Sequence, residues 1–494
     1  MSRRLPIFYS ALLLTGVNLL LRLVGTSFQV YLSGRIGAEG IGLLQLVMSV
    51  GSMALVAGTA GIRTATMYLT AEESGRKTPG NVIWVLSGSI TYSILCSAAV
   101  GAAVYLFAPV LAEKWIGNIH TVDSIRLFGI FLPINCLTGV MVGYFTGSNR
   151  IGTLAAVEVA EQIFSMAITL LLLHFWAGNS AEKACQSVVL GSGMSACMTL
   201  CSLALLRILE NAKHNKQISI AKRITATAVP LALADDLRTG ITTIENLIVP
   251  KRLALYPGVI SPLAEFGTVC GMVFPVLMFP AALLFGLTEL LVPELARCRA
   301  AGSDSRIRYL VQRCLHIALL YGVICAGILF LSAPQLCQAL YNNENAGKYL
   351  RWFAPLAILL YCDCVTDAMI KGLGQQTASV RYNILTNTMD VILLYILLPQ
   401  YGISGYFFSF LVTHLLNFVL SIRRLLKITG ERIRISVPVL AVAAAILAVW
   451  IAAFTPTAPL RSISYVIVLF CLLFLFHVVS KEDLIWLKGL TRKK

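Results

Sequence analysis

Residues 81–107 read NVIWVLSGSITYSILCSAAVGAAVYLF and contain no charged side chain. About 20 mostly apolar residues are enough for a helix to cross a bilayer. Runs of this kind recur along the chain, and of its 494 residues 57% are hydrophobic and only 13% are charged. Soluble domains carry about 25% charged residues. The composition therefore excludes an ordinary soluble enzyme or secreted domain and predicts an all-α, polytopic membrane protein.

The apolar runs predict about 14 transmembrane helices, with both termini on the same side of the membrane. The span over 224–249 is the least apolar, because it contains Asp235, Asp236, Arg238 and Glu245. The predicted spans are 8–33, 41–69, 81–107, 124–147, 152–177, 185–207, 224–249, 264–291, 309–332, 350–372, 378–398, 402–426, 433–454 and 460–479.

The basic residues orient these spans. With the N-terminus in the cytoplasm, 27 of the 39 Lys and Arg residues fall on the cytoplasmic side, 9 fall outside, and Arg22, Arg63 and Arg238 lie within spans. Positive residues gather in cytoplasmic loops. The bias places both termini in the cytoplasm. It also explains the net charge of +16 without a nucleic-acid partner.

The two halves of the chain resemble each other at a nearly fixed offset in residue number. Four pairs of segments match, and their offsets are 226, 225, 225 and 227: Ala38-Glu39 with Ala264-Glu265, Leu106–Pro109 with Leu331–Pro334, Arg126–Phe128 with Arg351–Phe353, and Gly147 with Gly374. We expect the first pair to open predicted helices 2 and 8, and the second to end helices 3 and 9. The third pair would open helices 4 and 10. The fourth would mark the turn between helices 4 and 5 and the turn between helices 10 and 11.

This repeat predicts two six-helix lobes around a central cavity, because six helices return the chain to its starting side. The lobes would be residues 1–210 and 224–430, joined by a cytoplasmic linker at 211–223. Residues 431–494 would add two further helices and a basic tail. Parallel repeats that face a cavity are typical of carriers that work by alternating access.

The sequence shows no catalytic constellation. It lacks a phosphate-binding loop, and its six His residues have no metal-ligand spacing. The 13 Cys residues are best interpreted as small apolar side chains. We therefore predict no enzyme activity, no cofactor and no metal site.

Arginines in mid-span are the first candidates for substrate binding. A charge in the membrane costs a few kcal/mol, so such residues usually face a cavity or a partner. Arg22 lies too deep in the first span to reach the cytoplasmic surface, and Arg63 follows Gly61 in the second. Lys251 and Arg252 follow the seventh span on the outer side. Guanidinium groups bind phosphate through two hydrogen bonds, so these cations favour an anionic substrate. The alternative is an Arg–carboxylate pair between helices.

Carboxylates in the spans are the candidates for ion coupling. Glu158 and Glu161 are three residues apart and share a helix face, and Glu245 lies in the seventh span. A desolvated carboxyl group can take up a proton and release it when water enters, which would link ion movement to conformation. The alternative driving force is the membrane potential acting on the arginines. For Glu289, Asp363 and Asp390 we favour pairing with an arginine on another helix.

Five stretches resemble the stage V sporulation protein B group of the multidrug/oligosaccharidyl-lipid/polysaccharide exporter superfamily. They lie in order between residues 1 and about 430. The stretches are GAEGIGLLQL (37–46), GIRTATMYLTAEESGRK (61–77), VEVAEQ (157–162), IENLIVPKRLALYPG (244–258) and LLVPELARCRAAG (290–302).

The resemblance implies a flippase of the bacterial cytoplasmic membrane that acts on a lipid-linked saccharide. The best-known substrate of such flippases is lipid II, the undecaprenyl-pyrophosphate precursor of cell-wall peptidoglycan. It also implies a monomer without a cofactor.

By position, Arg22, Arg63 and Arg252 match basic residues of the group, and Glu161 with Gln162 matches its helix 5 motif. The chain departs from the group at Gln29 and Ser165, where Arg is usual, and at Glu245, where Asp is usual. Gln29 thus joins the candidate substrate-binding residues. Because the chain has fewer cations at these positions than the group usually has, a lipid-linked glycan other than lipid II is an alternative substrate.

Two other functions compete with the flippase. One is an H⁺- or Na⁺-coupled multidrug efflux carrier of the same superfamily, whose cavity would be dominated by carboxylates. The other is a membrane scaffold that transports nothing. Arg22 and Arg63 favour the flippase, and Glu158, Glu161 and Glu245 keep the efflux carrier open. The repeat and the buried charges argue against a scaffold.

Overall fold

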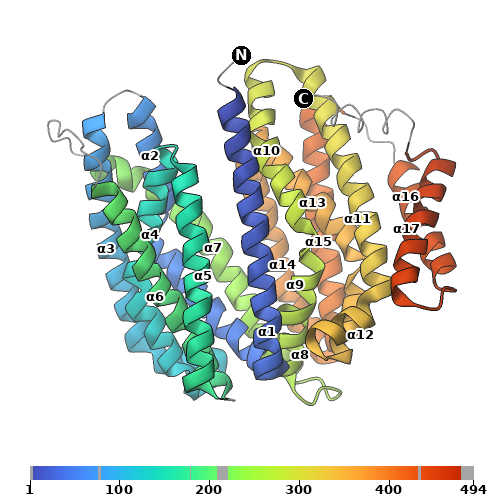
Figure 1. The fold of residues 1–494 in the computed structure, drawn as a ribbon, viewed down its shortest axis with the longest axis horizontal. Helices are drawn as coiled ribbons and strands as arrows, with labels where there is room; N and C mark the ends of the chain where they lie inside the picture. The colour runs from blue at the N-terminus through green and yellow to red at the C-terminus, as the bar shows by residue number, and fades with distance from the viewer. Residues whose placement is uncertain (1–3, 76–78, 179, 209–220, 432–435, 480–494) are drawn as a thin grey trace. The chain divides into compact units, whose positions relative to one another are not determined.

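The computed structural model describes residues 4–75, 79–178, 180–208, 221–431 and 436–479, and the regular structure in these ranges is entirely helical (Figure 1). The predicted all-α class is confirmed. The α-helices are α1 (Arg4–Thr59), α2 (Ile62–Gly75), α3 (Pro79–Val110), α4 (Val122–Gly147), α5 (Ile151–Leu172), α6 (Ala181–Ile208), α7 (Ala221–Leu253), α8 (Pro262–Thr268), α9 (Phe274–Met278), α10 (Ala281–Ala300), α11 (Asp304–Tyr341), α12 (Glu344–Phe353), α13 (Leu356–Gly372), α14 (Gln376–Tyr401), α15 (Ile403–Thr429), α16 (Ser436–Ala452) and α17 (Ala458–Leu475). Three π-helical segments, η1 (Leu111–Ile116), η3 (Leu173–Ala177) and η4 (Val269–Val273), and a 3₁₀ turn, η2 (Ile119–Thr121), complete the list.

Many of these helices are long and apolar enough to cross a membrane. Within the described ranges there are eight such segments, or up to ten if each of two bent pairs is one span. One of the eight, Leu19–Glu73, covers both the first and the second predicted span, and α16 and α17 are shorter apolar helices. The chain is therefore a multi-pass membrane protein, and the inventory agrees with about 14 spans.

The second predicted span, 41–69, is two helices and not one. Gly37 separates it from the first span with a φ of 70°, and Ala60 and Gly61 break it with φ angles of 45° and 70°. A β-carbon on Gly61 would lie 2.3 Å from the carbonyl oxygen of Ala228. Glycine is required here for both its left-handed backbone and the close approach of α7.

The predicted spans 264–291 and 350–372 are also broken. The helical segments Pro262–Met278 and Ala281–Ala300 meet at 60°, and Glu344–Phe353 meets Leu356–Gly372 at 57°. Pro280 and Pro355 stand at these two breaks as N-cap residues. Proline has no N–H to continue the helix before it, which explains both bends.

The chain forms two compact units. The first unit contains residues Met1–Gly271 and Asn387–Tyr406, and the second contains Met272–Thr386 and Phe407–Lys494. These boundaries differ from the predicted lobes, because α7 and α8 pack within the first unit. The lobes at 1–210 and 224–430, and the cavity between them, stay predictions. The linker 211–223 lies mostly outside the described residues.

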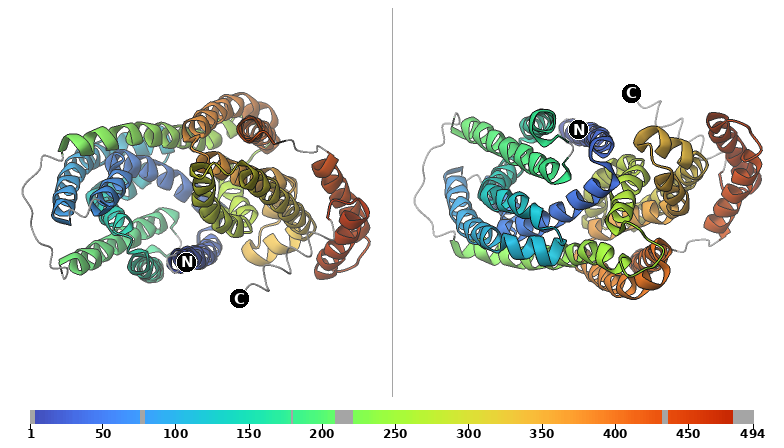
Figure 2. Two further views of the ribbon diagram at one scale, coloured as in Figure 1. Left: turned by 90° about the horizontal axis from the view of Figure 1, so that it is seen from above. Right: turned by 90° about the horizontal axis from the view of Figure 1, so that it is seen from below.

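Each unit has its own packing. In the first unit α3 lies against α4 and α5 against α6, as Figure 1 shows. In the second unit α16 and α17 run side by side (Figure 2) and pack on α11. There the buried Tyr465 donates to the carbonyl oxygen of Val323 at 2.8 Å. Gly327 provides the space, since a β-carbon would lie 2.0 Å from the Tyr465 ring.

The internal repeat recurs in the local structure, at the offset seen in the sequence. Asn118 and Asn343 are N-caps whose side-chain oxygens accept from backbone N–H groups at 2.9 and 3.0 Å. Each is preceded by a left-handed residue, Gly117 and Asn342 respectively. Two helices, α5 and α14, also begin at equivalent positions of the repeat.

An aromatic contact repeats at the same offset. The guanidinium of Arg126 lies 5.5 Å from the ring centroid of Tyr105, and that of Arg351 lies 5.5 Å from the ring centroid of Phe330. The repeat predicted from sequence is therefore present in the backbone and in side-chain contacts.

Two details of the predicted repeat are wrong. Pro334 does not end its helix, because α11 reaches Tyr341, whereas α3 ends at Val110, one residue after Pro109, and is followed by η1. The structural counterpart of Gly374 is Asn149 and not Gly147, since Asn149 and Gly374 have left-handed φ angles of 58° and 69°.

Candidate functional site

Arg63 lies at the start of α2, immediately after the break at Gly61. Its backbone is held tightly, because a β-carbon on Gly143 of α4 would lie 2.4 Å from the Arg63 carbonyl oxygen. Its side chain is exposed in the isolated chain. A rigid backbone at a helix break thus presents a guanidinium within a membrane-spanning segment.

Glu158 and Glu161 of α5 lie close enough to Arg63 to interact with its charge. Both side chains are partly buried, and both interact electrostatically with the Arg63 guanidinium. Their spacing of three residues predicts a common helix face. The structure therefore brings the predicted substrate-binding cation and two predicted ion-coupling carboxylates into one charged site, the Arg63–Glu158–Glu161 cluster.

Arg22 lies on α1 in the same unit and is partly buried. Its backbone carbonyl accepts a hydrogen bond from Thr26 Oγ1 at 2.9 Å. That Arg22 and Arg63 face one cavity stays a prediction.

Gln29 has a role in helix packing. Its side-chain amide donates to the carbonyl oxygen of Gly271 at 2.8 Å. Gly271 lies in the π-helical segment η4. A π-helical turn disturbs the regular hydrogen bonds of an α-helix, so the amide of Gln29 provides a partner for a carbonyl there.

Lys251 and Arg252 have partners near the end of α7. The Arg252 guanidinium lies 3.7 Å from the ring centroid of Tyr395, and its Nε donates to the Tyr395 carbonyl oxygen at 3.1 Å. Lys251 Nζ donates to the carbonyl oxygen of Lys114 in η1. Arg252 therefore contacts α14 and Lys251 contacts η1, whereas Arg63 interacts with charges on α5.

Glu245 meets Asp390, a pairing that the sequence did not predict. The Glu245 carboxyl group forms a hydrogen bond with the carboxyl group of Asp390, whose side chain is 5% exposed. Tyr406 and Cys270 lie beside them, with 3.8 Å between the hydroxyl and the thiol. A hydrogen bond between two carboxyl groups requires a proton on one of them. The sequence pattern favours an arginine next to Asp390, whereas the structure places the carboxyl group of Glu245 there.

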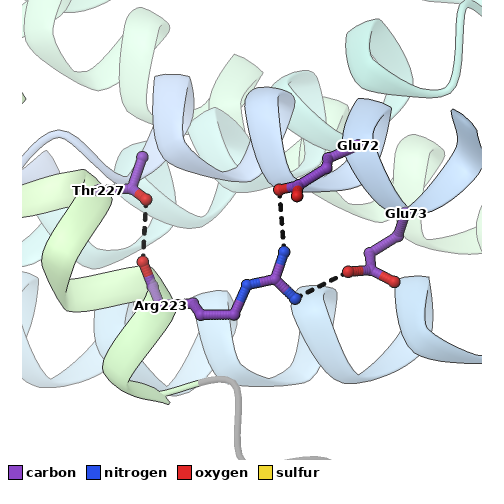
Figure 3. A network of polar contacts seen from close by, with 4 residues as sticks. All are labelled: Glu72, Glu73, Arg223 and Thr227. Carbon is purple, nitrogen blue, oxygen red and sulfur yellow. Dashed lines mark hydrogen bonds and ion pairs between the residues drawn. The ribbon is translucent and has the colours of Figure 1, made fainter. Parts of the chain in front are cut away.

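A second ion-pair site joins α7 to the end of α2 (Figure 3). Arg223 donates to Glu73 Oε1 at 2.8 Å and to Glu72 Oε2 at 2.9 Å. Glu73 has a side chain only 2% exposed. Beside this Arg223 clamp, Ile224, the next residue of α7, is buried in an apolar cluster that also contains Leu69 of α2.

No sequence signal indicates the Arg223 clamp. Its partners are 150 and 151 residues apart, and the pattern of apolar runs places Arg223 in a cytoplasmic loop. In the described part of the chain, no group of three or more His, Cys, Asp or Glu side chains is arranged to hold a metal ion.

Comparison with known proteins identifies relatives along most of the chain. A family model described as "Polysaccharide biosynthesis protein" matches residues 8–247, and one described as "MatE" matches residues 261–396. The chain is 24% identical to Stage V sporulation protein B of Bacillus subtilis (strain 168) over 410 residues, or 80% of this chain and 78% of that protein. It is 24% identical to Lipid II flippase MurJ of the same organism over 406 residues, or 73% of this chain and 71% of that protein.

Solved structures show the same fold. A structure of Lipid II flippase MurJ in an inward closed conformation aligns with a TM-score of 0.69 and 12% identity, covering 96% of this chain and 100% of the other. An inward-facing multidrug resistance MATE family transporter of the MOP superfamily aligns with a TM-score of 0.67 and 14% identity, covering 85% of this chain and 100% of the other. The resemblance expected from the sequence motifs is confirmed.

Proposed function

We propose that the chain, which resembles members of the multidrug/oligosaccharidyl-lipid/polysaccharide (MOP) exporter superfamily, moves an anionic lipid-linked saccharide across a membrane by alternating access. The proposal places it in the bacterial cytoplasmic membrane with both termini in the cytoplasm. It acts as a monomer, without a nucleic-acid partner and without a catalytic step.

The observation that carries this proposal is the Arg63–Glu158–Glu161 cluster. Intramembrane charges usually mark a substrate or ion pathway. Arg63 is held at a helix break, is exposed in the isolated chain, and interacts electrostatically with Glu158 and Glu161. A guanidinium with weak hydration and a rigid fork of donors suits a phosphate group.

The geometry supports a mechanism in which partners are exchanged. Without substrate, the Arg63 guanidinium interacts electrostatically with Glu158 and Glu161. A pyrophosphate that enters the site binds the guanidinium through charge-assisted hydrogen bonds, and Arg22 is the second cation. Glu158 and Glu161 then lose their counter-charge and take up a proton or a cation. Substrate binding is thereby coupled to ion binding.

The substrate class is a polyprenyl-pyrophosphate glycan. Lipid II, a precursor of cell-wall peptidoglycan, is the first candidate, and peptidoglycan synthesis in sporulation is a setting in which such a flippase would act. Support comes from the names of two relatives, Lipid II flippase MurJ and Stage V sporulation protein B. Membrane lipid is the second partner, since the apolar helices lie in it.

A cation-coupled multidrug efflux carrier is the second candidate function. Glu158, Glu161 and the Glu245–Asp390 pair favour it, because such a carrier needs carboxyl groups that exchange a proton or a cation. The match of residues 261–396 to the MatE model also supports it. In this function Arg63 would only neutralise Glu158 and Glu161.

A transport assay in proteoliposomes separates the two functions. The purified protein is reconstituted and offered fluorescent lipid II, a second fluorescent polyprenyl-linked glycan, and a cationic dye. We expect movement of at least one lipid-linked glycan and none of the dye. Transport of the dye alone would contradict the flippase and support the efflux carrier.

A further inference from the structure

Asp363 in the middle of α13 is a carboxyl group without a cation of its own. The nearest Lys on the same helix, Lys371, pairs with Asp367 at 2.6 Å, and Ser379 of α14 also donates to Asp367. The partner of Asp363 is an amide, because Asn417 Nδ2 of α15 donates to Asp363 Oδ2 at 2.9 Å. The arginine partner expected from the sequence is therefore replaced by an asparagine.

This acid–amide pair leaves two acceptor oxygens without a donor. Asp363 Oδ1 and Asn417 Oδ1 are both buried, and neither has a hydrogen-bond partner among the described residues. Asn417 is 7% exposed. A buried acceptor without a partner costs about 1–3 kcal/mol, and an ionised carboxylate in the interior without a counter-ion costs several kcal/mol more.

One proton on Asp363 removes all three costs, those of the two unpaired acceptors and that of the buried negative charge. A carboxyl and an amide group are both planar, and once they share one hydrogen bond a second can close across their remaining heavy atoms. Here the remaining atoms are both oxygens, so the second bond forms only if Asp363 carries a hydrogen. We propose that Asp363 is a proton-binding site of the second unit, with its Oδ1–H donating to Asn417 Oδ1.

Other ligands fit the pair less well. A buried water needs two to four polar partners, and both orphan atoms are acceptors. A metal ion prefers more oxygen ligands than two, and this part of the chain has no third acidic, His or Cys ligand arranged to help. The remaining groups that interact with Asp363 are Cys362, Asp367 and Lys371 on its own helix, and the last two neutralise each other.

The site is suited to coupling, which rests on the proposed transport function. The pair joins α13 to α15, so any movement that separates these helices or admits water removes the acceptor of the Asp363 proton. The carboxylic acid then ionises and releases H⁺ to water, and the reverse movement takes H⁺ up. Proton binding would thus favour the packed arrangement of α13 and α15.

Infrared spectroscopy of the purified protein in nanodiscs tests the protonation directly. A protonated carboxyl group has a C=O stretching band that shifts in D₂O and disappears on ionisation. We expect this band at mildly acidic pH. Because the Glu245–Asp390 pair also holds a proton, the Asp363 band is identified as the difference between the unmodified protein and Asp363→Asn, which should lose one carboxyl band and keep the other. That variant should fold, because an amide–amide pair with Asn417 keeps both hydrogen bonds. The Asp367→Asn variant is the matched control and should keep the band.

The outcomes separate this site from the proposed function. Asn417→Val should move the Asp363 band to higher frequency, because its hydrogen bonds are lost. A spectrum unchanged by Asp363→Asn in a folded protein would overturn the proposal, as would a band that Na⁺ abolishes at constant pH. A band that meets the prediction in a protein that flips no lipid-linked glycan would leave the proton site standing and reject the flippase.

Discussion

The two halves of the chain share their turns but differ in their membrane charges. Asn118 and Asn343 are N-caps at equivalent positions of the repeat, the first of the 3₁₀ turn η2 and the second of α12. The positions that the same offset pairs with Glu158, Glu161 and Arg63 are instead Asn383, Thr386 and Thr288. Asn383 and Thr386 bond to carbonyl groups of their own helix. The charges of the Arg63–Glu158–Glu161 cluster are therefore not required by the repeated framework, which supports a functional role for them.

Removing Arg63 should have the largest effect on transport. Each charge-assisted hydrogen bond contributes about 1.5–3 kcal/mol, so Arg63→Ala should weaken substrate binding by about tenfold or more. Arg63→Lys keeps the charge but loses the fork of donors, so it should be partly defective. The flipping rate in proteoliposomes measures both variants. Thr288→Ala, at the equivalent position of the second half, should transport normally, and an equal defect there would remove the contrast between the halves.

Among these variants, the one that breaks the Arg223 clamp should have the largest effect on stability. In Arg223→Ala the carboxylate of Glu73, which is 2% exposed, would lose its ion pair with Arg223. We expect a loss of about 1–3 kcal/mol in thermal or denaturant unfolding of the detergent-solubilised protein. The matched control is Arg297→Ala in the second unit. Its Arg297–Glu294 pair spans 3.6 Å and the arginine side chain is 60% exposed, so the loss should be below about 1 kcal/mol.

The repeated caps should give two equal and smaller effects. Asn118→Ala and Asn343→Ala each remove one cap hydrogen bond, and each should lower the free energy of unfolding by about 1 kcal/mol. The same unfolding measurement serves for both variants. Effects that differ severalfold would mean that the two turns are alike in shape but not in energy.

The repeated cation–π contacts should give the smallest effects. Arg126→Gln and Arg351→Gln each remove a guanidinium 5.5 Å from an aromatic ring, and each should cost about 0.5–1 kcal/mol. Transport should not change, because neither residue belongs to the Arg63–Glu158–Glu161 cluster. A transport defect in Arg126→Gln with unchanged stability would assign that arginine to the substrate path instead.

Most of the fold could be predicted from the sequence, because apolar runs and basic loops report directly on membrane spans. The helix breaks were harder. Gly61 and Pro280 are visible in the sequence, but a glycine or a proline within an apolar run is also common in unbroken membrane helices. Gly61 marks a break only because α7 approaches it closely, which is a tertiary contact.

The site could be predicted only in part for the same reason. The spacing of Glu158 and Glu161 gives their shared helix face, and the cost of a buried charge singles out Arg63. That α2 and α5 bring these residues together does not follow from any local pattern. The contacts of Glu245 with Asp390 and of Arg223 with Glu73 join residues far apart in the chain, beyond the reach of helical periodicity.

The binding of a purified lipid-linked pyrophosphate to the double variant Arg22→Ala, Arg63→Ala tests the central claim most directly. Affinity is measured in detergent or nanodiscs next to the unmodified protein and the double Lys variant, with folding checked by thermal unfolding. We predict that the Ala variant loses about tenfold or more in affinity and that the Lys variant lies between the two. Unchanged affinity in a folded Ala variant would contradict the account and leave both arginines as partners of carboxylates on neighbouring helices.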